Sequence, residues 1–315
     1  MSTRPQIPAT RALPISGTEE VKINKRPWYR SKDWSPLDAT SKFSKYLILF
    51  FMTIFAIYTI MPIWWLIVGA TKPDGELFSG NGFWFSDFNL WENLQTLFTI
   101  QDGVYGYWLL NSLLYAGLGG MCSTLFAVMM GYALAKYKFR GRGVVFAIVL
   151  AGVLIPASVF AIPLYLLFSG TGIINTFWSV FIPSMVSPFG VYLSRTYAAE
   201  SVPDEVIEAG RMDGASEFRI FFQIGLRMMA PALLTIFLFQ FVSVWTNYLL
   251  PSLMLANDKL QPVTVGLVTW QYMRGMPVGY SSVVTGALVS VIPVVILFLS
   301  LQRFWAKGLS AGAIK

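Results

Sequence analysis

Histidine is absent from this chain of 315 residues, and cysteine occurs once, as Cys122. The missing histidine removes the commonest general base and the commonest metal ligand of proteins. A single cysteine inside an apolar run forms neither a disulfide framework nor a cysteine-based metal site, so we expect Cys122 to be a small buried apolar residue. An enzyme is the least favoured class, because the apolar runs hold no carboxylate pair and no histidine or cysteine arrangement for nucleophilic catalysis.

Charged residues are also scarce, at 12% of the chain, whereas hydrophobic residues make up 55% and aromatic residues 16%. The mean hydropathy is +0.59. One soluble core would not bury this much apolar side chain. The composition therefore predicts an all-α, polytopic membrane protein in contact with membrane lipid.

Six apolar runs have the length of about 20 residues that a helix needs to cross roughly 30 Å of hydrocarbon. They are Tyr46–Ala70, Trp108–Ala135, Val144–Phe168, Thr176–Leu193, Met229–Leu255 and Val283–Gln302. Residues 1–45 are polar, basic and Pro-containing, without the apolar region of a cleavable signal peptide. We predict a mobile cytoplasmic tail over 1–45 and a six-span membrane domain over 46–315.

The Lys and Arg residues give the orientation, because cytoplasmic segments retain them. Twenty of the 23 lie in the amino-terminal tail, in the loops after the second and fourth runs, and in the carboxyl-terminal tail. The alternate loops hold only Lys72, Lys259 and Arg274. Both termini are therefore predicted in the cytoplasm, and the formal charge of +7 is a topology signal with no nucleic-acid partner implied.

The six runs contain no Asp, Glu, Lys or Arg. An ionisable group at the bilayer centre costs about 2.5 to 3.5 kcal/mol and normally marks an ion or proton path, so a self-contained proton-coupled carrier is disfavoured. Prolines interrupt the later runs, at Pro156, Pro163, Pro183, Pro188, Pro251 and Pro293. Proline is simply common in membrane helices, but the kinks also suit a transport path, with runs three to five as its walls.

The stretch 198–228 is the longest loop between spans on the cytoplasmic side, and its first part has the signals of a short helix. Ser201 and Asp204 have the spacing of a capping box, Pro203 is acceptable in a first turn, and acidic residues favour the positive end of the helix dipole. These signals predict a helix from about Val202 to Ala209.

Gly210 and Gly214 then permit a sharp turn, and Phe218, Phe221, Phe222 and Gly225 have the spacing of a second helix on apolar surface. Such a hairpin would lie parallel to the membrane. A docking surface requires small residues that allow close backbone approach and charged residues that supply orientation. The small residues here are Ala209, Gly210, Gly214 and Ala215. The charged residues are Glu205, Glu208, Arg211 and Asp213. An ordinary amphipathic interfacial loop remains the alternative.

The segment "EAGRMDGASEFRIFFQIGL" resembles the EAA loop of ABC importer permeases. The family pattern is Glu-Ala-Ala, three residues, Gly, nine residues, Ile, one residue and Leu-Pro. The residues on this pattern are Glu208, Ala209, Gly214, Ile224 and Leu226. Two positions depart from it, with Gly210 in place of the second Ala and Arg227 in place of the Pro.

The resemblance extends over roughly residues 45 to 315. The stretches "IPLYLLFSGTGIINTFWSVFIPSMVSPFGVYLSR", "RMDGAS" and "LQRFWAKGLSAGAIK" are similar to the MalG-like permeases of carbohydrate importers, the shorter member of a heterodimeric pair. "WTNYLLPSLM" resembles the Trp-Asn-x-Phe stretch of that branch, with Thr246 inserted before Asn247. The implied fold is that of a type I importer permease with six transmembrane helices and cytoplasmic coupling helices.

The resemblance also implies the partners. The chain has no G-x-x-x-x-G-K-[ST] loop, so it cannot hold ATP phosphates in the standard way, and ATP and Mg are expected on a cytosolic ABC ATPase dimer. No catalytic, cofactor-binding or metal residue is expected in this chain. A second, MalF-like permease and an extracytoplasmic sugar-binding protein complete the importer, in a bacterial or archaeal plasma membrane. Glu208, Ala209 and Gly214 would form the core of the ATPase contact.

Residues of the sugar path follow less directly from the sequence. Sugars bind aromatic faces and amide or hydroxyl groups, and such residues within the runs are Asn111, Tyr165, Trp245, Asn247 and Tyr248. Each can equally be a packing or interface residue, because Trp and Tyr also populate interfacial belts. Two other functions stay open: a permease of the same superfamily for another solute, such as a peptide or amino acid, and a stand-alone secondary carrier.

Overall fold

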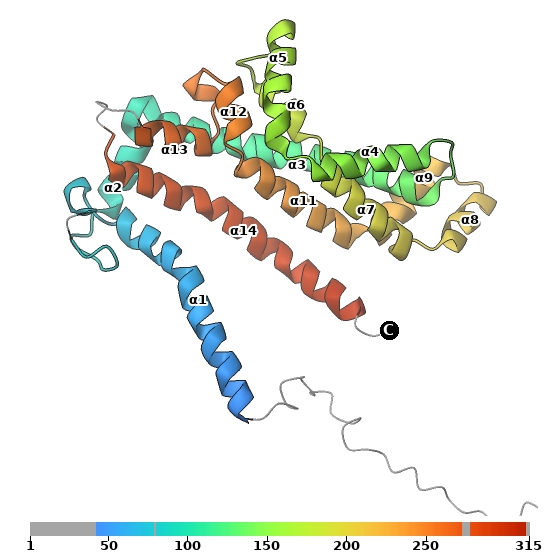
Figure 1. Ribbon diagram of the computed structural model, residues 1–315, viewed down its shortest axis with the longest axis horizontal. Helices are drawn as coiled ribbons and strands as arrows, with labels where there is room; N and C mark the ends of the chain where they lie inside the picture. Colours follow the sequence, from blue (N-terminus) through green and yellow to red (C-terminus); the bar gives the residue numbers. More distant parts are fainter. Residues whose placement is uncertain (1–41, 79, 273–277, 313–315) are drawn as a thin grey trace, which may run out of the picture. The chain divides into compact units, whose positions relative to one another are not determined.

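The computed structural model describes residues 42–78, 80–272 and 278–312, and every regular element among them is a helix (Figure 1). The tail predicted at 1–45 lies, up to residue 41, outside the described residues. Residues 273–277 of the loop before the last span and residues 313–315 also lie outside them. The chain divides after Thr59 into two units, of which the second, from Ile60 onward, holds all elements but the first part of α1.

Four helical segments are long and apolar enough to cross a membrane, and six if each of two bent pairs is one span. The first of these segments lies in α1 (Lys42–Ala70) and the second consists of α2 (Leu90–Thr99) and α3 (Val104–Lys136). Another lies in α14 (Tyr280–Gly312). The fourth contains α6 (Phe177–Ser184) and α7 (Pro188–Ser201). These counts agree with a polytopic, all-α membrane protein.

The third predicted span is broken. α4 (Arg142–Leu154) is followed by a 3-10 turn and α5 (Ala161–Thr171), with a bend of 99° between the two halves. Ile155 at the break has extended backbone, because the ring of Pro156 disfavours helical angles in the preceding residue and supplies no N–H donor. The uninterrupted run Val144–Phe168 expected from hydropathy is therefore two helices.

The fifth predicted span is also shorter than its apolar run. α11 (Ala230–Trp245) ends ten residues before Leu255, and a separate helix, α12 (Leu249–Met254), follows it. The extra apolar residues of the run thus belong to a second short helix. The remaining elements are α13 (Val263–Tyr272) and the 3-10 turns η3 (Asp74–Glu76), η4 (Ile100–Gly103), η5 (Ala157–Phe160) and η7 (Asp258–Leu260).

Helix α3 packs against α6 and α7 through a stripe of small residues. Gly119, Ser123, Ala127 and Gly131 follow one another every four residues, so they lie on one face of α3, and all are buried. A Cβ on Gly119 would lie 2.4 Å from Ser184 Oγ, and one on Gly131 would lie 2.7 Å from the backbone nitrogen of Arg195. Close backbone approach through small residues is how helices associate in lipid.

Cys122 corrects an expectation from the sequence. Its side chain is partly exposed on α3 and not fully buried. The stripe that faces α7 consists of residues spaced four apart, among them Gly119 and Ser123. Cys122 is not part of this stripe and points to a different side of α3, away from the tightest contact.

The stretch predicted to be a cytoplasmic hairpin, within residues 198–228, contains several short helices. α8 (Asp204–Met212) is followed by α9 (Glu217–Ile220), a π-helical turn η6 (Phe221–Gly225) and α10 (Leu226–Met228). α8 starts two residues later than predicted and ends three residues later. The capping box does not form, because Ser201 is the last residue of α7 and Pro203 holds the N-cap position of α8.

Candidate functional site

Helix α8 has one buried face and one exposed face. Ile207 is 3% exposed and packs in a core cluster with Ile220 and Phe221, whereas Glu205 and Glu208 are exposed. The exposed face of α8 therefore carries the acidic residues, and the buried face fixes the helix to the membrane-spanning part of the chain. Ala209 and Asp213 are also exposed, and Ala215 is half-buried.

Gly210 lies on the buried face. A Cβ at this position would lie 3.2 Å from Ile220 Cγ1 and 3.6 Å from Ile224 Cδ1. The small residue thus allows α8 to approach the helix that follows, and it is not open to a partner. Ile224, a further residue of the EAA pattern, forms the other side of this contact.

Gly214 closes the turn between α8 and α9 with a φ of +76°, in the left-handed region that favours glycine. The amide of Ala215 donates to the Gly210 carbonyl at 3.0 Å, and the amide of Gly214 donates to the Arg211 carbonyl at 3.0 Å. This pair of bonds is a Schellman motif with glycine at its C′ position. The predicted sharp turn at this glycine is confirmed.

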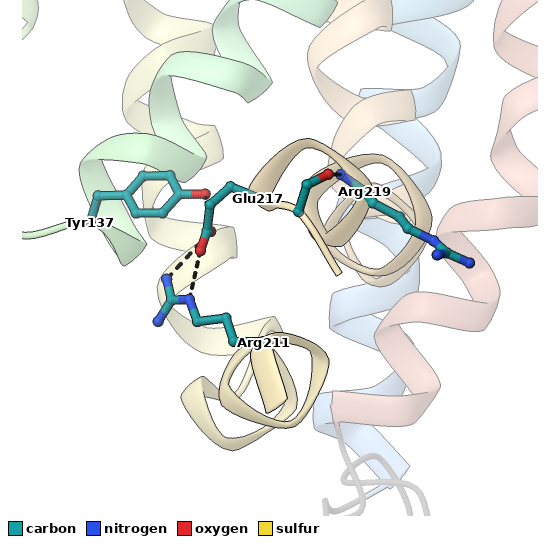
Figure 2. A network of polar contacts seen from close by, with 5 residues as sticks. Tyr137, Arg211, Glu217 and Arg219 are labelled. Carbon is teal, nitrogen blue, oxygen red and sulfur yellow. Dashed lines mark hydrogen bonds and ion pairs between the residues drawn. The ribbon is translucent and has the colours of Figure 1, made fainter. Parts of the chain in front are cut away.

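A polar network holds the two helices together (Figure 2). Arg211 Nε donates to Glu217 Oε1 at 2.6 Å, and the Tyr137 hydroxyl donates to Glu217 Oε2 at 2.8 Å. Ser216 Oγ accepts from the amide of Arg219 at the start of α9. Because Tyr137 follows the end of α3, Glu217 connects both helices of the hairpin to a membrane-spanning helix. We call Tyr137, Arg211 and Glu217 the clamp.

The clamp and a second ion pair shift the pKa of the groups involved. Hydrogen bonds from Arg211 and then Tyr137 lower the pKa of the Glu217 carboxyl, and the bond to Glu217 raises the pKa of Arg211. Asp204 accepts from Lys136 Nζ at 2.8 Å, which lowers the pKa of that carboxyl. These carboxyls are therefore ionised at neutral pH, and the hairpin is held by charge-assisted hydrogen bonds.

Arg227 occupies the position where the family pattern has proline. It is exposed in α10, and the chain bends by 79° between the helical stretch Glu217–Met228 and α11. Met229 at this bend has non-helical backbone, and Pro231 stands in the first turn of α11. The bend thus forms although the family's proline is replaced by Arg227, and the nearest proline, Pro231, lies four residues further along the chain.

A cavity of about 920 Å³ lies among α3, the two halves of the third span, α6, α7 and α11. Four of the predicted kink prolines line it, namely Pro156, Pro183, Pro188 and Pro251. Its polar side chains are Ser112, Ser158, Ser184, Ser187, Gln240, Ser243 and Asn247, and none of the described residues that line it is charged. Aromatic side chains are also present, including Tyr115, Phe160 and Phe189.

Gln240 stabilises the break between α6 and α7. α6 ends at Ser184, whose carbonyl is one of the last four without a donor in its own helix, and Gln240 Nε2 of α11 donates to that carbonyl at 2.9 Å. A neighbouring helix thus satisfies a backbone group in the membrane, which is the condition under which such breaks are tolerated.

The residues predicted for the sugar path do not come together. Asn247 lines the cavity, whereas Asn111 is buried and donates to the carbonyls of Lys259 and Gln261 at 2.7 and 3.1 Å. Trp245 is buried and stacked on a neighbouring phenylalanine, and Tyr165 and Tyr248 are exposed outside the lining. Sequence reasoning missed Gln240, whose signal was an amide in the middle of the fifth apolar run.

The arrangement of broken membrane helices around an uncharged cavity, with a hairpin of short helices that carries the EAA-like residues, indicates a transport subunit. Residues 123–310 match the family model for the binding-protein-dependent transport system inner membrane component, and the chain belongs to this family. It is therefore a membrane component of a transport system and not an enzyme.

Curated relatives cover most of the chain. The arabinooligosaccharides transport system permease protein AraQ of Bacillus subtilis is 32% identical over 270 residues, which is 85% of this chain and 95% of the relative. The lactose transport system permease protein LacG of Rhizobium radiobacter is 25% identical, over 84% of this chain and 94% of the relative. The diacetylchitobiose uptake system permease protein NgcG of Streptomyces coelicolor is 26% identical, over 84% and 87%.

A solved structure shows the same fold. The crystal structure of a bacterial ABC transporter involved in the import of the acidic polysaccharide alginate contains a chain that matches with a TM-score of 0.74 at 23% identity. The match covers 87% of this chain and 99% of that chain. The importer-permease fold expected from the sequence is confirmed.

Proposed function

We propose that this chain is the permease subunit of an ATP-driven importer for a neutral sugar or oligosaccharide. The observation that carries the proposal is the cavity, whose hydroxyl, amide and aromatic lining offers the groups that bind sugars and no charge. The relatives AraQ, LacG and NgcG are each described as transporting a sugar or an oligosaccharide. An uncharged lining suits these solutes better than a peptide or amino acid with ionised ends.

The proposed energy input comes through the coupling loop, about 198–228. The exposed face of α8, with Glu205, Glu208 and Ala209, would dock into the ATPase, while Gly214 shapes the turn beside it. Closure of the ATPase dimer then moves α8 and, through the clamp, the end of α3. A rigid-body movement of this kind would switch the cavity between the two sides of the membrane.

The proposed assembly contains a cytosolic ABC ATPase dimer, a second permease and an extracytoplasmic sugar-binding protein. Both termini lie in the cytoplasm, with a basic tail over 1–45 and the permease domain over 46–315. The support for this orientation is the distribution of Lys and Arg, which places the EAA-like loop on the same side as the ATPase.

Two experiments test the function. Purification of the chain from its native membrane in mild detergent should recover an ATPase, a second permease and a sugar-binding protein, identified by mass spectrometry. The ligand of that binding protein names the solute class, and an ionised solute would overturn the sugar assignment. Recovery of the chain alone, still active in liposomes without ATP, would support a stand-alone carrier instead.

A cavity variant tests the site. Ser243→Phe adds a ring to the wall of the cavity and should abolish sugar uptake without loss of the assembled complex, because the added side chain fills space that the solute needs. Ser300→Phe, at an exposed serine of α14 outside the lining, is the matched control and should transport normally. Normal uptake by Ser243→Phe would show that the solute passes elsewhere.

A further inference from the structure

The segment between α1 and α2, residues 71–89, together with the first turn of α2, presents an unusual number of exposed aromatic side chains. Phe78, Phe88 and Trp91 are each 71% exposed and Trp84 is 66% exposed. Phe83 and Phe85 are also exposed. We call residues 71–78 and 80–89 the aromatic loop. It lies outside the part of the chain that matches the family model, residues 123–310.

The aromatic loop is fixed to the end of α1. Lys72 is 1% exposed, and its Nζ donates to the carbonyl of Asn81 at 2.7 Å. Asn93 Nδ2 donates to the carbonyls of Ala70 and Lys72, both at 2.9 Å, and the amide of Asn89 donates to the Thr71 carbonyl at 2.7 Å. The exposure of the aromatic residues is therefore a property of an ordered loop.

Part of the loop folds back along α1. The Trp64 indole Nε1 donates to the Phe83 carbonyl at 2.9 Å, and the rings of Trp64 and Phe85 meet edge to face at 5.6 Å. A Cβ on Gly82 would lie 3.4 Å from Trp65 Nε1. Because Trp64 precedes the end of α1 by six residues, residues 83–85 lie about 9 Å back along the helix from Ala70.

This position corresponds to the boundary of the hydrocarbon. The apolar helix Phe43–Ala70 has 28 residues, whereas about 20 are needed to cross the hydrocarbon, so roughly four residues extend beyond it at each end of a centred helix. Trp64 then lies near the boundary, and the residues at its level lie there with it. Trp and other aromatic side chains accumulate at this depth, where one part of the ring system is apolar and another can hydrogen-bond.

The charges near the loop favour a lipid occupant held by apolar contact. Lys72 is the last Lys or Arg before Lys136, and its ammonium is buried against Asn81. Asp87 and Glu92 are exposed, so the surface offers aromatic rings and carboxylates but no accessible cation in this stretch. Attraction to anionic headgroups therefore contributes nothing, and insertion of the rings is the available source of affinity.

We propose that the aromatic loop is a lipid-interface anchor, which inserts Phe83, Trp84 and Phe85 into the bilayer beside the end of α1. The geometry also orders the depth of its residues. Trp84 lies at the level of Trp64, whereas Asn89 is bonded to Thr71 at the end of the helix, so Trp91 lies nearer to water. Such an anchor holds this end of α1 at a constant depth while other helices move.

Spin labels test the depth order in the assembled importer, reconstituted in lipid nanodiscs. Because Cys122 is the one cysteine of the chain, a Cys122→Ser background accepts single labels at Trp84→Cys and Trp91→Cys. Collision with oxygen, which concentrates in lipid, is compared with collision with a water-soluble nickel chelate. Two exposed positions calibrate the scale: Phe55→Cys in the apolar part of α1 and Arg140→Cys in the turn between α3 and α4, outside the proposed ATPase contact.

The expected result is an oxygen preference at Trp84 that is smaller than that at Phe55, near the centre of α1, a still smaller preference at Trp91, and nickel preference at Arg140. The values should not change when salt or the fraction of anionic lipid is raised. Nickel preference at Trp84 would overturn the proposal, and protection from both reagents would show that a protein partner covers the loop. If Trp84→Cys does not assemble, Phe83→Cys reports the same depth.

Discussion

Gly214 shapes the turn between α8 and α9 through its backbone alone. Its φ of +76° is unfavourable for any residue with a Cβ, by about 1 kcal/mol, although no neighbouring atom lies within 4 Å of the added carbon. A bulky replacement such as Gly214→Trp would therefore strain the turn as well as obstruct a partner, so it does not isolate docking. A smaller substitution separates the two effects.

We expect Gly214→Ala to lower sugar uptake and the stimulation of the ATPase, because the Schellman turn that orients α8 is weakened. The measurement is transport and ATP hydrolysis by the reconstituted importer. Gly141→Ala is the matched control, since Gly141 has a φ of +86° and open space around it in a different turn, between α3 and α4. Equal losses in both variants would indicate general destabilisation and contradict a specific role for the hairpin.

The Glu217 carboxyl allows a prediction of how stability depends on pH. Because its folded pKa is lowered from the ordinary value of 4.5, its stabilising effect is fully present above that value and is lost as the pH falls through the lowered one. The thermal unfolding temperature should therefore show no contribution from Glu217 titration between about pH 8 and pH 5. Both partners of the ion pair are about half exposed, so solvent screens their attraction and the contribution of this pair to stability is small.

Glu217→Gln tests the clamp directly. The variant should lower ATP-dependent uptake clearly and change the unfolding temperature only slightly, since Glu217 connects α8 to Tyr137 at the end of α3. Arg219→Gln is a suitable control, because Arg219 bonds to Gln223 one turn along and not to the clamp. Identical transport by Glu217→Gln and the unchanged protein would show that the clamp does not transmit movement.

At the scale of the elements, the contact between α3 and α7 depends on glycine. A Cβ on Gly131 would lie 2.6 Å from Ser194 Cβ and 2.7 Å from the Arg195 backbone nitrogen, so the two helices must separate to accept it. Movement of a side chain cannot relieve a clash with backbone. Interfaces of this kind between membrane helices rely on close packing, since the surrounding lipid is as apolar as the side chains.

We expect Gly131→Ala to destabilise the protein by about 1 to 3 kcal/mol, the usual cost of overpacking a close contact. Gly117→Ala on the same helix is the control, because no atom lies within 4 Å of its added Cβ and alanine favours the helix by about 1 kcal/mol. Thermal unfolding in detergent measures both. A Gly131→Ala protein as stable as the Gly117→Ala protein would contradict the packing described for α3 and α7.

At the scale of the whole molecule, the six apolar runs contain no Asp, Glu, Lys or Arg. A proton relay through the membrane needs such groups, so the energy for transport must come from outside the chain. We expect uptake by the complete importer in proteoliposomes to stop without ATP and to continue in the presence of a protonophore. Uptake driven by an imposed proton gradient in the absence of ATP would contradict this expectation.

The sequence by itself determined the class of protein. Run length and the Lys and Arg distribution predict spans and orientation, and both depend only on local composition. The EAA-like spacing from Glu208 to Leu226 indicated the family, which the comparisons confirm. The turn at Gly214 could also be predicted, because one residue's preference for positive φ decides it.

Only the tertiary structure decided which side chains meet. Pro156, Pro188 and Gln240 line one cavity although they come from different segments of the chain, and Gly210 is buried against Ile220 instead of facing a partner. Asn111, expected on the sugar path, instead bonds the carbonyls of Lys259 and Gln261. The physical reason is that hydropathy and helix signals act over one or two turns, whereas burial and hydrogen-bond partners depend on contacts between different segments, which for Asn111 and Lys259 are 148 residues apart.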